Sequence, residues 1–252
     1  MNRLHQDKWL MFVIFVVVVC SVCGVLTGRA LGEAQAWGDF HAQQAAIKEH
    51  AEEVAAVNDV PYEEPSEEAS GYVFDEAADL QNPELPTGCE ATALATTLRM
   101  NGIEVSKEDV ADAMPKTDGS DFVNAFWGDP YSEYGWACMS PCVVETAKRF
   151  LPVEKTVVNL TGTNLVYLPT PCVVWVTMGI EGAIPSGREQ GGYELLWNPH
   201  CVTLVAAGEA TVTCIDPLEG EVVYPFSKFN AAYMANGSQA VYIADRGYKP
   251  TE

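Results

Sequence analysis

A long uncharged stretch near the N-terminus constrains this chain more than any other feature of its sequence. Trp9 to Leu26 are 18 consecutive residues without a charged side chain, and Arg3 and Lys8 precede them. A segment of this length can just span the hydrocarbon core of a bilayer, whereas the apolar part of a secretory signal is usually about 7–15 residues long. We therefore predict a single N-terminal transmembrane helix within residues 1–32, acting as a signal anchor. A cleaved signal peptide is the alternative, because small residues suited to a cleavage site follow the stretch.

The charges beside this stretch predict its orientation. Basic residues flanking a membrane span are retained on the cytoplasmic side. Because Arg3 and Lys8 come before the span, we expect the N-terminus inside the cell and the remaining chain outside it. The protein would then be a single-pass protein of the cell membrane, or a secreted one if the segment is cleaved.

The negative charge of the chain is unevenly distributed. The formal net charge is -21 at pH 7, with balances of +2 over residues 1–32, -12 over 33–80 and -11 over 81–252. Residues 33–80 are rich in Ala, Gln and Glu and have little apolar surface to bury, so we expect an acidic stalk there. Contacts to phosphates need clustered Lys and Arg, and the excess of acidic residues therefore argues against a nucleic-acid partner.

Residues 81–252 have the pattern of a globular domain. Cys89 to Met100 is predicted to be a helix, because its apolar residues recur at spacings of three and four. Thr87 or Gly88 can cap the start of this helix, and Asn101-Gly102 ends it. Further helices are predicted over Val143–Leu151 and Phe226–Met234.

Short segments rich in β-branched residues dominate the second half of this domain. The predicted strands are Cys172–Thr177, Cys201–Ala206, Thr211–Ile215, Glu221–Tyr224 and Ala240–Ile243. Helices followed by an antiparallel sheet predict an α+β fold.

Cys89 is the strongest candidate for a reactive residue. It stands in the first turn of the predicted helix, where unpaired N–H groups and the helix dipole favour a thiolate. A nucleophilic cysteine needs this lowered pKa and a base within reach. The alternative is that Cys89 is a small buried helix residue without chemistry.

His200 is the only histidine of the domain, so an imidazole base there must be His200. If the hairpin between the strands Cys201–Ala206 and Thr211–Ile215 centres on Gly208, His200 pairs directly with Asp216. Directly opposed residues of an antiparallel pair point to the same face. Asp216 would then orient the imidazole, which is the third role in a catalytic triad. The alternative is that Asp216-Pro217 is a turn that only ends a strand.

The residues around Cys89 resemble a known family. The stretch Gln81 to Ala91, QNPELPTGCEA, is similar to the motif of the bacteriocin-processing (double-glycine) peptidase-like family, within the papain-like cysteine peptidases. Three further segments are similar to segments of that family and follow in the same order. They are residues 121–130, Trp197 to His200, and Asp216-Pro217. The resemblance implies a papain-like α+β fold over residues 81–252. It also implies Cys89 as nucleophile, His200 as base and acid, and Asp216 as the residue that orients His200.

Gln81 is the candidate for a side chain that stabilises the oxyanion. Papain-like enzymes place this glutamine six residues before the cysteine, where this chain has Pro83, whereas Gln81 lies eight residues before Cys89. The loop must therefore differ if its amide is to act. The backbone N–H of Cys89 would supply another donor. The alternative is that Gln81 is an ordinary solvated loop residue.

The other cysteines of the domain raise the questions of disulfides and metals. Five remain after Cys89, so at least one stays unpaired, and an exported protein permits a disulfide between Cys138 and Cys142. The sequence does not determine their pairing. These cysteines include no Cys-x-x-Cys pair, so we predict no metal site and no cofactor. The five are Cys138, Cys142, Cys172, Cys201 and Cys214.

These features predict a membrane-tethered cysteine peptidase outside the cytoplasm, acting on a peptide or protein through a thioester intermediate. A second interpretation keeps the same three residues but makes peptidoglycan peptides the substrate. A third is an inactive papain-like module that binds a peptide at the cell surface, since intact residues alone do not demonstrate activity.

Overall fold

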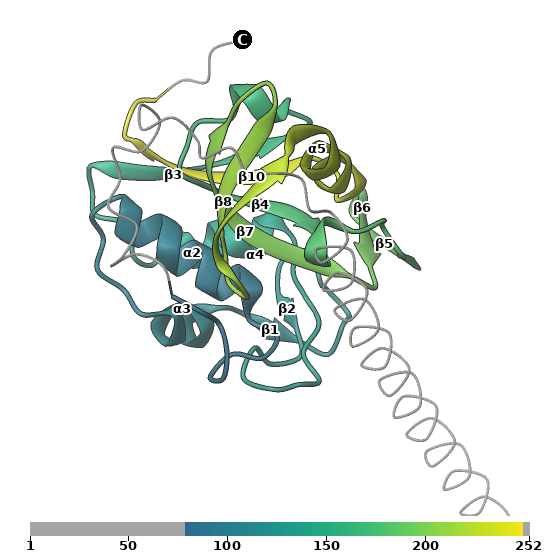
Figure 1. The fold of residues 1–252 in the computed structure, drawn as a ribbon. Coiled ribbons are helices and arrows are strands. Elements are labelled where there is room, and N and C mark those ends of the chain that lie inside the picture. Colours follow the sequence, from purple (N-terminus) through teal and green to yellow (C-terminus); the bar gives the residue numbers. More distant parts are fainter. Residues whose placement is uncertain (1–78, 249–252) are drawn as a thin grey trace, which may run out of the picture. The chain divides into compact units, whose positions relative to one another are not determined.

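The computed structural model describes residues 79–248 (Figure 1). The predicted membrane anchor and all but the end of the predicted stalk lie outside these residues. Within the described part of the chain, none of the helices has the length and apolar character needed to cross a membrane.

A six-stranded antiparallel sheet forms the centre of the fold (Figure 1). The strand order is β3-β10-β4-β7-β8-β9. The strands are β3 (Lys155–Thr161), β4 (Cys172–Thr177), β7 (Pro199–Ala207), β8 (Thr211–Asp216), β9 (Gly220–Pro225) and β10 (Gln239–Asp245). Every residue of β4 is buried, because β4 lies between β10 and β7 and has helices on both of its faces.

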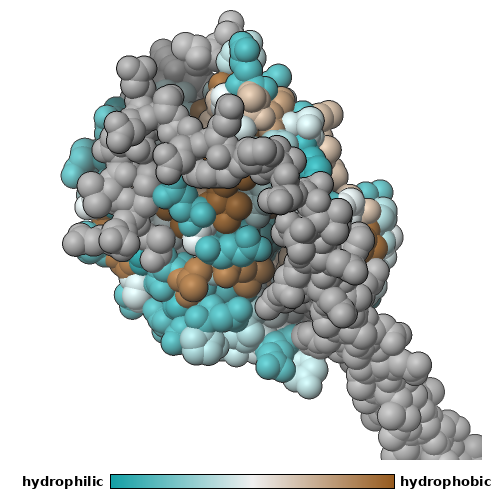
Figure 2. Space-filling view, viewed as in Figure 1, coloured by the Kyte–Doolittle hydropathy of each residue, from teal (hydrophilic) through white to brown (hydrophobic). Residues whose placement is uncertain are grey.

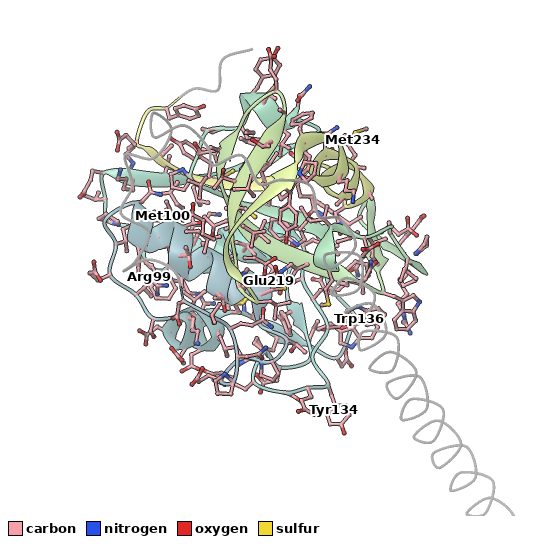
Figure 3. All side chains as sticks on the ribbon, in the orientation of Figure 1. Arg99, Met100, Tyr134, Trp136, Glu219 and Met234 are labelled. Carbon is pink, nitrogen blue, oxygen red and sulfur yellow. The ribbon has the colours of Figure 1, made fainter. Side chains whose placement is uncertain are left out.

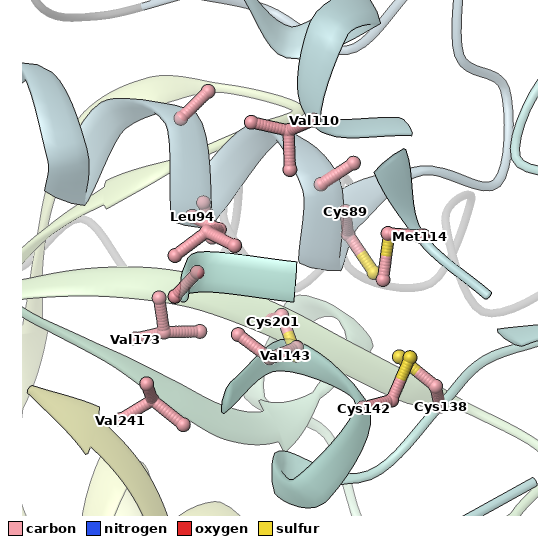
Figure 4. Close-up of a cluster of buried hydrophobic side chains, with 14 of the residues drawn as sticks. Cys89, Leu94, Val110, Met114, Cys138, Cys142, Val143, Val173, Cys201 and Val241 are labelled. Carbon is pink, nitrogen blue, oxygen red and sulfur yellow. The ribbon is translucent and has the colours of Figure 1, made fainter. Parts of the chain in front are cut away.

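Helices cover the two faces of this sheet. One face packs against α2 (Cys89–Met100) and α4 (Ser140–Ala147), and the other packs against α5 (Phe226–Ala235). Helix α3 (Lys107–Ala113) packs against α2. Figure 4 shows the first of the two buried clusters, with four cysteine sulfurs gathered at one end of it. The predicted α+β fold with an antiparallel sheet is therefore confirmed for the described residues.

Helix α2 has the predicted bounds, Cys89–Met100. Gly88 caps it without a side-chain hydrogen bond, and Asn101 ends it. All residues from Cys89 to Leu98 are buried, so the helix is enclosed on every side rather than on one apolar face. Its small Ala and Thr side chains permit this close packing, which the apolar spacing alone does not indicate.

Other predicted elements are present with shifted ends, and several were not predicted. Helix α4 covers Ser140–Ala147 rather than Val143–Leu151, because Pro141 stands in its first turn, a position that favours a helix start. Helix α3 and strand β3 were missed, although Ser106 and Asp109 form a capping box at the start of α3. The short elements that were also missed are β1 (Lys116–Thr117), β2 (Phe126–Trp127), β5 (Pro185–Gln190), β6 (Tyr193–Leu196), η3 (Leu165–Tyr167) and η4 (Met178–Ile180).

The predicted register of the β7–β8 hairpin is wrong. Thr203 pairs with Ile215 and Leu204 with Cys214, so the register near His200 is shifted by two residues from the prediction. Between Leu204 and Ala206 an irregularity changes the register by one residue, so that the pairs next to the turn are three residues from the prediction. Because side chains alternate along a strand, a shift of two residues keeps the same side chains on the same face. His200 and Asp216 therefore remain on one face, as diagonal rather than direct neighbours.

The exposed apolar side chains are dispersed over the surface. Figure 2 shows hydrophilic and hydrophobic residues interspersed on the face in view. Tyr134 and Met234, each 62% exposed, lie at opposite ends of the view in Figure 3. These two residues therefore do not belong to one continuous apolar patch.

The loop that leads into α2 packs closely against residues 128–135. The hydroxyl of Thr87 donates to the carbonyl of Ser132 over 2.9 Å. A Cβ on Gly135 would overlap the hydroxyl oxygen of Thr87 and lie 2.6 Å from the carbonyl oxygen of Asp129. This contact holds the start of α2 in place.

We predict that Gly135→Ala lowers the free energy of unfolding by about 1–3 kcal/mol, because the new methyl group overpacks this contact. Gly182→Ala is the matched control, since a Cβ there meets nothing within 4 Å. Chemical denaturation of the two variants and the wild type measures the difference. Equal stability of both variants would contradict the predicted close packing.

Candidate active site

Cys89 is the first residue of α2, and its side chain is buried, with 7% exposed. Its Sγ lies 3.2 Å from Oε2 of Glu90, and Cys201 and His200 are the other side chains that act on its pKa. The hydrogen bond from Cys201, followed by the hydrogen bond and charge of His200, holds the pKa of Cys89 well below its ordinary value, whereas burial opposes this shift. The lowered pKa favours the thiolate form of Cys89.

His200 and Asp216 form a buried ion pair. Nε2 of His200 lies 2.8 Å from Oδ1 of Asp216, and their side chains are 2% and 3% exposed. The same Oδ1 accepts a hydrogen bond of 2.8 Å from the backbone N–H of Leu218. Because Asp216 occupies Nε2, Nδ1 is the ring nitrogen left for Cys89.

The charges of this pair stabilise one another. Burial by itself would lower the pKa of His200, but the charge and hydrogen bond of Asp216, together with Cys89, raise it well above its ordinary value. Burial would raise the pKa of Asp216, but the charge and hydrogen bond of His200 lower it. These shifts favour a thiolate at Cys89, an imidazolium at His200 and a carboxylate at Asp216.

The structure thus brings Cys89, His200 and Asp216 together. Cys89 comes from the start of α2, His200 from the beginning of β7 and Asp216 from the end of β8. The predicted direct pairing of His200 with Asp216 was wrong, but the contact between their side chains is present.

Glu90 is a buried acid that the sequence analysis did not single out. Its side chain is 1% exposed, and its Oε1 accepts a hydrogen bond of 3.0 Å from the backbone N–H of Cys138. Burial, and then the negative charge of Cys89, raise the pKa of Glu90 well above its ordinary value. In its neutral form the carboxyl group can donate a hydrogen bond to the Cys89 sulfur, 3.2 Å away. The available signal was an acidic residue next to Cys89 in a helix that has no other charged residue before Arg99.

Cys201 lies next to Cys89, which the sequence did not indicate. It is fully buried in the core, on the face of β7 that α2 covers. Thr203 shares this face, and its hydroxyl donates to the carbonyl of Ala93 in α2 over 2.9 Å. Burial, and then the hydrogen bond to Cys89, raise the pKa of Cys201 well above its ordinary value. The raised pKa favours the neutral thiol of Cys201, which can donate a hydrogen bond to Cys89.

Gln81 is buried rather than solvated, with 3% exposed. Its backbone N–H donates to the carbonyl of Pro217 over 2.8 Å, which attaches the Gln81 loop to the turn after Asp216. Its side-chain Nε2 donates to the carbonyl of Pro86 over 3.0 Å. Its Oε1 is buried and has no hydrogen-bond partner among the described residues. In this state the amide nitrogen of Gln81 is engaged within its own loop.

Lys107 fixes the Gln81 loop from the other side. Its Nζ, on the largely buried side chain, pairs with Glu84 at 3.0 Å and Asp79 at 3.3 Å, and it donates to the carbonyl of Leu80. Burial opposes the charge, but the hydrogen bond to Glu84 and the charge of Asp79 raise the pKa of Lys107. These partners lie 23 to 28 positions before Lys107 in the sequence, and no local sequence pattern indicated the contact.

Trp197 lies in a row of aromatic rings. It stacks on Trp136 with ring centroids 4.6 Å apart, and Trp136 lies 4.7 Å from Trp127. The guanidinium of Arg188 lies 4.7 Å from the ring centroid of Trp127. The labelled side chain of Trp136 marks this row in Figure 3. The row gives the segment before His200 rigid, well-packed support.

All six cysteines of the described residues are free thiols. The disulfide considered for Cys138 and Cys142 is therefore absent from this structure. Their sulfur atoms are neighbours, as Figure 4 shows, and both side chains are fully buried.

We predict that iodoacetamide modifies Cys89 far faster than the other thiols of residues 79–248, because the lowered pKa of Cys89 favours its reactive thiolate form. Its rate should fall much less between pH 8 and pH 6 than the roughly 80-fold expected for a free thiol of pKa 8.5. Peptide mass spectrometry after timed labelling measures the rate at each residue. Cys172 and Cys214 are buried controls whose pKa values burial raises. Uniform modification of all the cysteines would contradict this prediction.

Comparisons with known proteins found structures with a similar fold. A protein from Bacillus anthracis described as a C39-like peptidase has a similar structure, with a TM-score of 0.60, 28% identity, and 70% of this chain and 98% of that chain covered. Two more distant structures have TM-scores of 0.43. One is a double glycine motif protease from an AMS/PCAT transporter in complex with the leader peptide, with 15% identity, and 66% of this chain and 90% of that chain covered. The other is the peptidase domain of Streptococcus ComA, with 11% identity, and 67% and 98% covered.

A search of curated proteins found no significant match. The sequence itself matches the Peptidase_C39 like family over residues 57–241, which is most of the chain. The resemblance seen in the motif around Cys89 is therefore confirmed, and the chain belongs to the Peptidase_C39 like family of papain-like cysteine peptidases.

Proposed function

We propose that this protein is a cysteine peptidase that cleaves a peptide bond with Cys89 as nucleophile, His200 as acid and base, and Asp216 as the residue that orients His200. The observation that carries the proposal is the buried contact of 2.8 Å between His200 and Asp216, next to Cys89, whose pKa His200 helps to lower. Membership of the Peptidase_C39 like family supports the same reaction class.

The charge states of the three residues suit an acyl transfer. The Cys89 thiolate attacks the carbonyl carbon of the substrate, and the carbonyl oxygen takes the negative charge of a tetrahedral intermediate. The His200 imidazolium then gives its proton to the leaving amine, and a thioester with Cys89 remains. Neutral His200 next takes a proton from water, which attacks the thioester and releases the acid and the Cys89 thiolate. Asp216 stabilises the imidazolium at the start and end of this cycle.

The oxyanion needs hydrogen-bond donors beside Cys89. The backbone N–H of Cys89 is one, because the first residues of a helix have no carbonyl one turn earlier to bind. Gln81 is a second candidate, and its attachment to Pro217 keeps it close to the turn that follows Asp216. Its Nε2 has to leave the carbonyl of Pro86 before it can act on substrate.

We further propose that the catalytic domain acts outside the cytoplasm on a peptide or protein. The uncharged segment Trp9 to Leu26 and the basic residues before it support a membrane tether. Peptidoglycan peptides are the alternative substrate, because they would use the same three residues.

Asp216→Asn should lower kcat by about 10²–10⁴-fold, because His200 loses the carboxylate that orients and stabilises it. Asp216 raises the pKa of His200, so the variant should also lose activity at a lower pH on the alkaline side. The pH dependence of kcat/KM measures this shift. Asp245→Asn removes an exposed carboxylate of β10 and is the control. An alkaline limit that stays in place would contradict the assigned role of Asp216.

The reaction itself is tested with a diverse peptide mixture and with purified peptidoglycan. The full-length protein should generate new amino termini in the peptide mixture, and Cys89→Ala should abolish them while leaving the thermal unfolding transition intact. New amines from peptidoglycan alone would assign the alternative substrate. Peptide binding by wild type without any cleavage of either material would overturn the proposed activity in favour of a binding module.

A further inference from the structure

We propose that Cys89, Glu90 and Cys201 together form a binding site for a thiophilic divalent cation such as Zn²⁺, and that the bound cation blocks Cys89 reversibly. The two sulfur atoms and a carboxylate oxygen all lie within 4.8 Å of one another. The site contains the proposed nucleophile, but the binding itself does not depend on peptidase activity.

The spacing suits a tetrahedral cation. Bonds of about 2.3 Å to sulfur and 2.0–2.2 Å to a carboxylate oxygen place neighbouring ligand atoms roughly 3.5–3.8 Å apart. Ligand atoms within 4.8 Å of each other reach this arrangement through small side-chain movements. Three protein ligands leave the fourth position of the cation for water.

The ligands come from two packed elements. Cys89 and Glu90 stand in the first turn of α2, and Cys201 lies on the face of β7 that α2 covers. Figure 4 shows Cys89 and Cys201 at the sulfur-rich end of this cluster. The other oxygen of Glu90 is held by the N–H of Cys138, which orients the carboxylate as an outer contact of a metal ligand does.

The ligand set selects among metal ions. Two thiolates with one carboxylate favour Zn²⁺ and similar soft or borderline ions, whereas Ca²⁺ and Mg²⁺ prefer sets made only of oxygen. Cys89 already offers a thiolate. On binding, Cys201 and Glu90 each release a proton to solvent, so charge and protons balance without any redox step.

This site escapes sequence analysis for a simple reason. Cys201 lies 112 positions after Cys89, and neither belongs to a Cys-x-x-Cys pair. Only the packing of α2 on β7 brings the two sulfur atoms together. Coordination would occupy the lone pair that Cys89 needs for attack, so the cation and a peptide substrate would exclude each other.

Cobalt(II) is a direct probe of this site, because it takes the place of zinc and absorbs light when thiolates bind it. The experiment uses the full-length protein with Cys20 and Cys23 replaced by serine. We expect near-ultraviolet charge-transfer absorption and the visible bands of tetrahedral cobalt, both removed by one equivalent of Zn²⁺. Zn²⁺ should also protect Cys89 from iodoacetamide.

Cys201→Ala should remove about half of the charge-transfer absorption. It should also lower the affinity for Zn²⁺ by more than the 10–100-fold that is typical when a hydrogen bond to a metal-bound ligand is lost. Glu90→Gln should lower the affinity for Zn²⁺ with little loss of the charge-transfer absorption. Cys172→Ala is the matched control, because Cys172 is equally buried but lies in the cluster on the other face of the sheet. Thermal unfolding of each variant verifies that it folds.

Unchanged cobalt absorption in Cys201→Ala, or an equal loss in Cys172→Ala, would overturn the proposed site. The spectrum needs no substrate, so it also separates this proposal from the proposed peptidase activity. Cobalt binding through both thiolates without any peptide cleavage would support the metal site and contradict the proposed peptidase activity.

Discussion

The buried ion pair between His200 and Asp216 is the interaction on which the rest of the site depends. Two charges with 2–3% exposure are costly to remove from water, and they are tolerated only when each is paired and hydrogen-bonded. Asp216 also accepts from the N–H of Leu218, and His200 is hydrogen-bonded to Cys89. Removing one partner of such a pair typically costs about 3–5 kcal/mol, so the pair constrains both the fold and the chemistry.

The surroundings of Cys89 extend this electrostatic arrangement. His200, Cys201 and Glu90 all act on the pKa of Cys89. Burial raises the pKa values of Cys201 and Glu90, which favours neutral forms that can donate hydrogen bonds to the sulfur of Cys89. A thiolate in a dry core would otherwise be unstable. The same donors become cation ligands when they lose their protons. The stabilised nucleophile and the proposed cation site are therefore consequences of one cluster.

The sequence predicted those parts of the fold that depend on local pattern. The bounds of α2 were correct because its apolar spacing, preceding Gly88 and following Asn101 are all local signals. The predicted turn was misplaced, because the chain turns at Glu209 and Ala210 rather than at Gly208. The irregularity between Leu204 and Ala206 then reduces the register error from three residues to two near His200. The His200–Asp216 contact survived this error, since an even shift leaves both side chains on one face.

The sequence by itself determined the family, the α+β class and the three candidate catalytic residues, because a helix-start cysteine, a lone histidine and a motif are readable along the chain. Only the tertiary structure decided the contacts between distant residues. It placed Cys201 against Cys89, Lys107 against the Gln81 loop, and the Gln81 amide on Pro86. Such contacts arise where helices pack on a sheet, and packing depends on shape and volume rather than on any local pattern.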